Sequence, residues 1–160
     1  MKRISTLTVV ALAAFLLLGS LPVLAVERPF ALNHKGFAPL ITDPAGNPIG
    51  ADAVSSGTAT HFGLCTLVAR VNFSPDPNQP GRLISSGTGT ITSADGEKIQ
   101  IEFNGGLVPN GDGTATDTAV FRFVGGTGRF AGAHGSANAI VQVNLVTGAY
   151  ELTMVGNIDY

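Results

Sequence analysis

The sequence of 160 residues contains no tryptophan, only two tyrosines and a single cysteine, Cys65. One cysteine cannot form an intramolecular disulfide, so the fold must be held by side-chain packing and backbone hydrogen bonds. Charged residues make up only 12% of the chain, and its nine Lys and Arg residues form no cluster. This chain lacks the basic surface that nucleic-acid-binding proteins need. We therefore expect no nucleic-acid partner.

A helical pattern is also missing after residue 25. Apolar and polar residues instead alternate with a period of two, as in 98–103 and 150–159. This period is typical of strands with one apolar face. Eight strands are predicted, at about 30–38, 56–63, 64–73, 82–93, 97–104, 114–124, 129–145 (bent or split by its glycines) and 150–159.

Turn residues separate these segments. The pair Asp95-Gly96 indicates a tight hairpin turn, 110–113 indicates a longer loop, and 147–148 indicates another turn. The proline-rich stretch 74–81 reads as a protruding loop, and 42–51 as an irregular connector. Strands joined in this order predict an all-β fold, an eight-stranded antiparallel up-and-down β-barrel whose interior is filled or narrowly hollow.

The N-terminus has the pattern of a secretory signal peptide. Lys2 and Arg3 precede an apolar run over 8–18, and Val23-Leu24-Ala25 resembles a cleavage site. Val26, rather than a cysteine, follows that site, which argues against a lipoprotein. We expect a signal peptide over 1–25 and a secreted or periplasmic domain over 26–160. Within this single domain, 26–54 is predicted as an N-terminal strand and irregular connector, and 55–160 as the barrel core.

The glycine-rich segment "GGTGRFAGAHGSA" over 125–137 matches G-x-G-x-x-A, which in dinucleotide-binding proteins opens a helix. Here further glycines and alternating residues follow, so a turn between strands is expected. This segment, with "GTATHFG" at 57–63 and "GTGTITSADGEKI" at 87–99, resembles the allene oxide cyclase-like and dirigent-like barrels, above all small secreted bacterial proteins of that group. The resemblance spans about residues 55–159 and implies an eight-stranded antiparallel barrel with a central cavity.

Plant members of that group guide or catalyse closure reactions of apolar intermediates, mainly by the shape of the cavity. Dirigent proteins carry an arginine soon after the phenylalanine of this motif, whereas Ala131 to His134 follow Phe130 here. No catalytic residue is carried over. Three functions stay open: a barrel that binds a small apolar molecule, a cavity enzyme of cyclase, isomerase or dirigent-like type, and a structural or interaction protein of the cell envelope.

A small outer-membrane barrel is a variant of the third function. The alternating last strand ends on the aromatic Tyr160, as outer-membrane barrels often do. Two tyrosines and no tryptophan cannot supply aromatic girdles, which argues against a membrane partner. Oligomeric state is not readable from the sequence.

Polar residues give no clear site. His34, His61 and His134 lack metal-ligand spacing and are expected to be separate structural or surface residues. Asp112 and Asp117 lack the other ligands of a calcium loop and are expected to be solvated in a loop and turn. Neither a metal nor a cofactor is expected. Cys65 is expected to be a small buried residue. On the outer face, Glu102 is expected to be solvated and Arg122 to face a carboxylate across strands.

The better candidates for a binding site are the apolar residues of the alternating strands. Exposed together on a monomer, they would form a large apolar patch, so they are predicted to face inward. Glycines and alanines on the same segments leave room for a small cavity open at one end. The predicted lining is Leu67, Val71, Phe73, Ile101, Phe103, Phe121, Phe123, Val141 and Met154.

Overall fold

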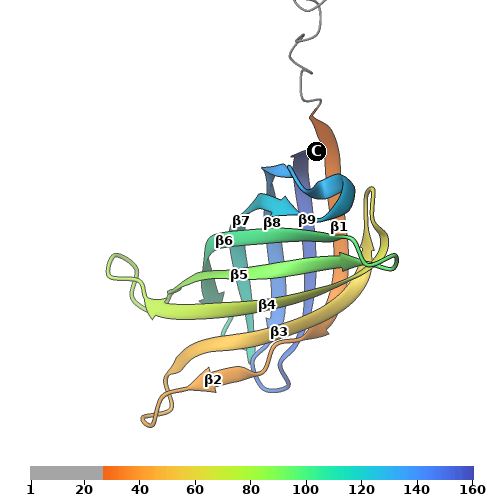
Figure 1. The fold of residues 1–160 in the computed structure, drawn as a ribbon. Helices are drawn as coiled ribbons and strands as arrows, with labels where there is room; N and C mark the ends of the chain where they lie inside the picture. The colour runs from red at the N-terminus through yellow and green to blue at the C-terminus, as the bar shows by residue number, and fades with distance from the viewer. Residues whose placement is uncertain (1–26) are drawn as a thin grey trace, which may run out of the picture.

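A computed structural model describes residues 27–160 (Figure 1). The predicted signal peptide lies outside these residues. None of the helical segments within 27–160 is long and apolar enough to span a membrane. The elements are β1 (Arg28–Phe37), β2 (Leu40–Thr42), β3 (Pro48–Ala59), β4 (Gly63–Pro75), β5 (Leu83–Ser93), β6 (Lys98–Pro109), β7 (Thr114–Gly126), the 3₁₀ turn η1 (Gly128–Phe130), β8 (His134–Asn144) and β9 (Ala149–Asp159).

The strands form one closed antiparallel sheet. From β3 to β9 each strand pairs with the next along the chain, and β1 closes the barrel by pairing with both β9 and β3. Strand β2 pairs with the part of β3 that lies next to the β1 pairing, and it keeps the same register: Phe37 of β1 lies opposite Val54, and Leu40 of β2 lies opposite Ala51. Pro39 separates β1 from β2 because proline has no N–H to donate to a ladder. The predicted eight-stranded antiparallel barrel is therefore confirmed, with β1 and β2 together as one interrupted strand.

The strand predictions were wrong mainly around β3. This strand begins at Pro48 and ends at Ala59, whereas 42–51 was predicted as irregular and the strand as 56–63. Pro48 and Gly50 misled the prediction because both normally interrupt strands. Pro48 is the first residue of the strand, where a missing N–H is tolerated. The segment 129–145 is indeed split, and its strand begins only at His134.

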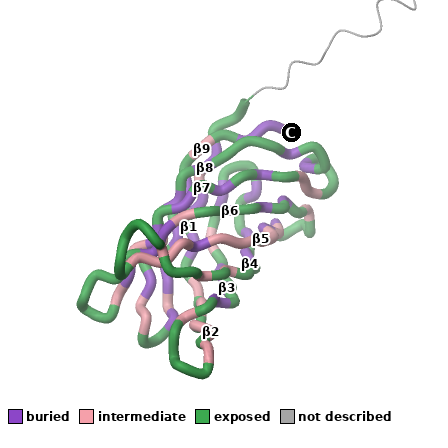
Figure 2. The backbone as a smooth tube through the Cα atoms, turned by 90° about the vertical axis from the view of Figure 1, so that its left-hand side faces the viewer, coloured by how far each residue is buried: buried purple, intermediate pink, exposed green. Residues whose placement is uncertain are grey.

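The interior contains the apolar residues of alternating positions, as the period of two predicts. Burial alternates along β4, β6, β7 and β9, with buried residues on the inner face (Figure 2). All nine predicted lining residues belong to the hydrophobic core or pack against it. Ring stacking between Phe103 and Phe121, with centroids 4.7 Å apart, spans β6 and β7 inside the barrel.

One end of the barrel is closed by aromatic side chains. Phe130 of η1 is fully buried and packs against Phe62, with ring centroids 4.4 Å apart, and against Tyr160, at 4.6 Å. Phe30 at the start of β1 packs against Phe123 near the end of β7. These rings lie where the chain passes between β3 and β4 and between β7 and β8. They occupy the space that would otherwise open to solvent.

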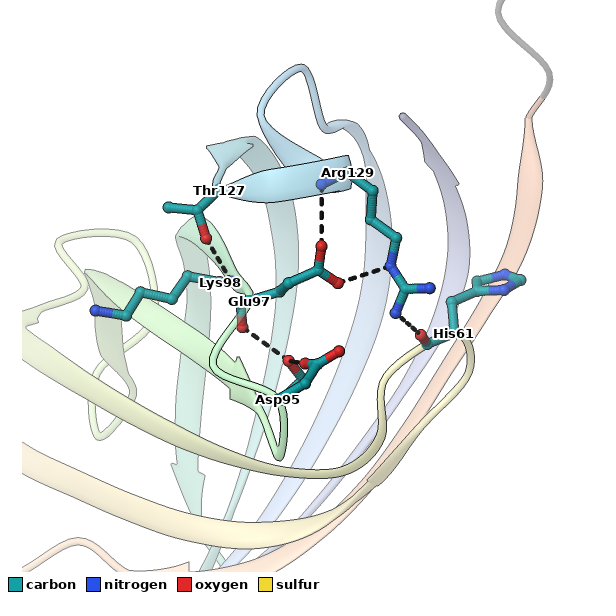
Figure 3. A network of polar contacts seen from close by, with 7 residues as sticks. His61, Asp95, Glu97, Lys98, Thr127 and Arg129 are labelled. Carbon is teal, nitrogen blue, oxygen red and sulfur yellow. Dashed lines mark hydrogen bonds and ion pairs between the residues drawn. The ribbon is translucent and has the colours of Figure 1, made fainter.

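The glycine-rich segment holds this closure in place (Figure 3). Arg129 donates its backbone N–H to Glu97 Oε1 (3.0 Å), its Nε lies 2.8 Å from Glu97 Oε2, and its Nη2 donates to the carbonyl of His61 (2.9 Å). Gly128 has φ of +58°, and a Cβ there would lie 2.4 Å from Glu97 Oε1. The turn that was predicted here is confirmed, and it ties three loops together at the closed end.

Candidate functional site

An apolar cavity of about 80 Å³ lies toward the opposite end of the barrel, beside β2. Several of its walls are alanines, which leave space that larger side chains would fill. A water molecule needs roughly 10–15 Å³ of such volume, so the cavity has room for a compact molecule. Its lining consists of Ala38, Leu40, Ala51, Ala53, Leu67, Ala69, Val71, Phe73, Phe103, Leu107, Asp117, Ala119, Phe121, Val141, Val143, Tyr150 and Leu152.

The predicted lining residues divide between this cavity and the packed core. Those that line the cavity are Leu67, Val71, Phe73, Phe103, Phe121 and Val141. The other three, Ile101, Phe123 and Met154, are buried and do not line it. Phe123 contacts Phe30 of the aromatic closure instead. The period of two identified the inner face, but it does not show how far along the barrel each residue lies.

Asp117 is the charged group of the cavity wall, and its predicted place in a solvated loop was wrong. It lies within β7, on the inner face, and is 8% exposed. Ser85 Oγ of β5 donates a hydrogen bond to its Oδ1 at 3.0 Å. Desolvation raises the pKa of this carboxyl above its usual range, although the Ser85 and Gly106 hydrogen bonds and the charge of Arg82 oppose the shift. Asp117 therefore takes up a proton more readily than a surface aspartate.

Tyr150 is the second polar group of the wall. It belongs to β9 and is 6% exposed, and its hydroxyl forms no hydrogen bond with any residue of 27–160. Burial raises the pKa of the phenol, and the nearby Ser55 hydroxyl opposes this shift, so the phenol stays protonated at neutral pH. A buried hydroxyl without a partner costs roughly 1–3 kcal/mol. Tyr150 is thus an unused hydrogen-bonding group beside an apolar cavity.

Behind Tyr150, three polar side chains are joined inside the barrel. His34 of β1 is 3% exposed, with Nδ1 3.0 Å from Ser55 Oγ of β3 and Nε2 3.2 Å from Cys65 Sγ of β4. Burial lowers the pKa of His34 to about 4 and raises that of Cys65 to about 11. At neutral pH both are uncharged, and they form a hydrogen-bonded pair rather than an ion pair. Cys65 is buried as predicted, and its histidine partner was not predicted.

Two glycines allow these side chains to meet across an intervening strand. Gly36 of β1 lies opposite Tyr150 on one side and Ser55 on the other. Gly57 of β3 likewise separates His34 from Cys65. A Cβ on Gly57 would lie 2.0 Å from the Asn33 carbonyl oxygen and 2.6 Å from the His34 ring. The absence of these two side chains permits the bonded row Ser55–His34–Cys65 and lets Tyr150 lie beside Ser55 without a hydrogen bond to it.

The remaining polar candidates lie outside the cavity. His61 donates from Nε2 to the Pro29 carbonyl (3.0 Å), and His134 Nε2 lies 3.4 Å from the Asp159 carboxylate. Glu102 and Arg122 are exposed, as the period of two predicted, and the register of β6 and β7 places them directly opposite each other. Asp112 accepts hydrogen bonds from Thr114 in the turn before β7.

The structure brings no metal site together. Within residues 27–160, no three or more His, Cys, Asp and Glu side chains are placed to hold a metal ion. His34 and Cys65 are adjacent soft donors, but two donors alone do not make up the coordination sphere that a structural zinc requires.

No protein-family model matches the sequence, and no curated protein matches it. A solved structure of a pterocarpan synthase dirigent protein is similar to the chain, with a TM-score of 0.49 and 15% sequence identity over 88% of this chain and 89% of that one. Membership of the allene oxide cyclase-like and dirigent-like group stays a prediction.

Proposed function

We propose that this protein binds a small, mainly apolar molecule in the cavity beside β2. The observation that carries the proposal is the cavity itself, because an eight-stranded barrel is narrow enough for side chains to fill it completely. Its walls are apolar except for two polar groups, Asp117 and Tyr150. A mostly apolar lining with a few polar groups is the usual composition of a small-molecule site.

The size of the cavity limits the ligand to a compact molecule. Sites for drug-sized ligands have volumes of roughly 300–1,000 Å³, well above the volume found here. A single-ring compound of about nine non-hydrogen atoms is a suitable probe, since the site is bordered by partly exposed residues, Val71 and Phe73, toward its mouth. Isopropylbenzene has this size and no polar atom.

A cavity enzyme is the second candidate, and Asp117 favours it. A carboxyl whose pKa is raised by burial in an apolar site is able to donate a proton to a bound molecule. Asp117 also has a fixed orientation, because Ser85 holds one of its oxygens. Binding is the simpler proposal because the cavity supports it without any assumption about a reaction.

The test uses tryptophan fluorescence, because the natural chain has no tryptophan. Phe73→Trp places the reporter at the cavity, where titration with isopropylbenzene should change its emission saturably. Ala69→Leu in the same background adds three carbons to the cavity wall and should weaken binding at least tenfold. Its control is Val68→Leu on the same strand, whose side chain is exposed on the outer face and should leave binding unchanged.

Binding that survives Ala69→Leu, or that is lost equally in Val68→Leu, would place the ligand elsewhere. No saturable response in Phe73→Trp, together with a melting temperature that isopropylbenzene does not raise in the natural protein, would refute the proposal and favour a structural barrel.

A further inference from the structure

The Tyr150 hydroxyl is a hydrogen-bonding group to which the fold itself gives no partner. It is buried, it borders the cavity, and no residue of 27–160 bonds to it. Buried hydroxyl groups in folded proteins almost always have a partner, from the protein or from a bound molecule. Tyr150 also borders a more open surface pocket that includes Lys35 and Glu151, but the apolar cavity is the more enclosed of the two spaces and can hold a molecule out of solvent.

The hydrogen bonds among Ser55, His34 and Cys65 determine whether Ser55 can offer a proton or a lone pair to the Tyr150 hydroxyl. Two arrangements of protons satisfy the contacts of His34. In the first, His34 Nε2–H donates to Cys65 and Ser55 donates to Nδ1; in the second, Cys65 donates to Nε2 and Nδ1–H donates to Ser55. The neutral state of His34 and Cys65 permits both arrangements.

In both arrangements the phenol proton of Tyr150 is left without an acceptor. In the first, Ser55 can only accept from Tyr150; its hydroxyl is close enough to oppose the rise in the pKa of the phenol, but the Tyr150 hydroxyl does not meet it in the geometry of a hydrogen bond. In the second, the Ser55 proton is free to turn toward the Tyr150 oxygen, which leaves the phenol proton pointing away from Ser55. In either arrangement Tyr150 therefore has a proton to donate into the cavity.

We infer that Tyr150 selects, among compact apolar molecules, those that carry a hydrogen-bond acceptor such as a carbonyl oxygen. This inference rests on the proposed function, because it names the chemical class that the same cavity takes. The apolar remainder of the molecule would contact the alanine, leucine and phenylalanine walls. A ligand carboxylate is disfavoured, since no cationic side chain lines the cavity among the described residues and Asp117 does.

Asp117 is the competing explanation for such selectivity. In its protonated form it also has a proton to donate. Its carboxyl already accepts hydrogen bonds from Ser85 and from the backbone of Gly106, whereas the Tyr150 hydroxyl has no partner among the described residues. A test of Tyr150 must therefore include Asp117→Leu, which is similar in size but has no group that can donate a hydrogen bond.

The experiment compares two ligands of similar shape by isothermal titration calorimetry at pH 7. Acetophenone has a carbonyl acceptor and isopropylbenzene has none. Because the carbonyl makes acetophenone better hydrated than isopropylbenzene, the quantity to compare between proteins is the ratio of the two affinities. The preference for acetophenone over isopropylbenzene should be about 3- to 10-fold larger in the natural protein than in Tyr150→Phe, the effect of about one neutral hydrogen bond. Asp117→Leu alters the cavity wall for both ligands, but the ratio of their affinities should stay that of the natural protein.

The outcomes separate this inference from the proposed function. If neither ligand binds the natural protein, the proposed function fails. If the ratio of the two affinities is the same in Tyr150→Phe as in the natural protein, the cavity binds ligands but Tyr150 does not select them. If Asp117→Leu alone lowers this ratio, the acceptor is recognised by Asp117 and the inference is wrong.

A folding control accompanies the measurements. Tyr150→Phe deletes a buried hydroxyl that has no partner, so the ligand-free variant should melt at the same temperature as the natural protein or higher. A lower melting temperature would show that the hydroxyl already has a structural partner, and this result would also overturn the inference.

Discussion

The row of polar side chains inside the barrel depends on Gly57, and replacing this glycine with alanine tests that dependence. A Cβ at position 57 would lie 2.0 Å from the backbone oxygen of Asn33 and 2.6 Å from Cδ2 of His34. Backbone oxygen cannot move away without separating β1 from β3, which pair directly at this point. The ring of His34 would also lose its fit between Ser55 and Cys65.

The expected cost of Gly57→Ala follows from these contacts. Overpacking of a well-packed interior costs typically about 1–3 kcal/mol. For a domain of this size, this cost lowers the melting temperature by roughly 3–12 °C. Thermal unfolding followed by circular dichroism measures the shift, and urea unfolding gives the change in free energy.

Gly132→Ala is the matched control for this prediction. Gly132 has no heavy atom within 4 Å of its ideal Cβ position and no left-handed φ. An alanine there should be neutral or stabilising by up to about 1 kcal/mol, since it reduces the entropy of the unfolded chain. Equal melting temperatures for Gly57→Ala and the natural protein would refute the claim that strands β1 and β3 approach too closely for a side chain.

Two further predictions concern pH. The pKa of Asp117 is raised in the folded state, so its contribution to stability is largest in acid and is lost as the pH rises through that pKa. Asp117→Asn should therefore raise the free energy of unfolding at pH 7, measured by urea unfolding. This gain should disappear below about pH 4. The pKa of His34 is lowered to about 4, so its contribution is present above the unfolded value near 6.5 and is lost as the pH falls toward 4. In the natural protein, the free energy of unfolding should fall by about 3 kcal/mol from this cause as the pH is lowered to about 4. If His34→Gln shows the same pH dependence of the free energy of unfolding as the natural protein, this assignment to His34 is wrong.

Much of the fold was predictable because the alternation of apolar and polar residues can be read within each strand, without knowing which strands pair. In β7, for example, Ala115, Ala119, Phe121 and Phe123 share one parity, and all face inward. Asp117 has the same parity, so its inward position was also readable from the pattern. It was misassigned because the neighbouring Asp112 and Gly113 suggested a solvated loop. Here periodicity was a better guide than local composition.

The polar row was not predictable, for a physical reason. His34, Ser55, Cys65 and Tyr150 are far apart in the sequence and lie on four different strands. They meet only because β1 closes the barrel between β9 and β3, with a register that the alternation within each strand does not specify. The same holds for the position of the cavity along the barrel axis, which depends on the stagger between strands.

The cavity and the polar row have a common origin in the small residues of the inner face. Neighbouring strands lie about 4.8 Å apart, so side chains two strands apart meet only if the strand between them offers no side chain of its own. Gly36 and Gly57 meet this condition for the polar row. Gly105 of β6 lies opposite Ser85 of β5, and its lack of a side chain leaves room for Ser85 to reach across β6 to Asp117 of β7.

The same lack of side chains that lets polar groups meet also leaves volume unfilled. At the end beside β2 the walls include Ala51, Ala53, Ala69 and Ala119, and a cavity remains. At the other end Phe30, Phe62, Phe130 and Tyr160 fill the barrel. One end is filled and the other is hollow because the large inward-facing side chains lie at the first end and the small ones at the second. A protein that needed only a stable barrel could carry larger side chains at both ends, so the alanine-lined end is where we expect selection for binding to act.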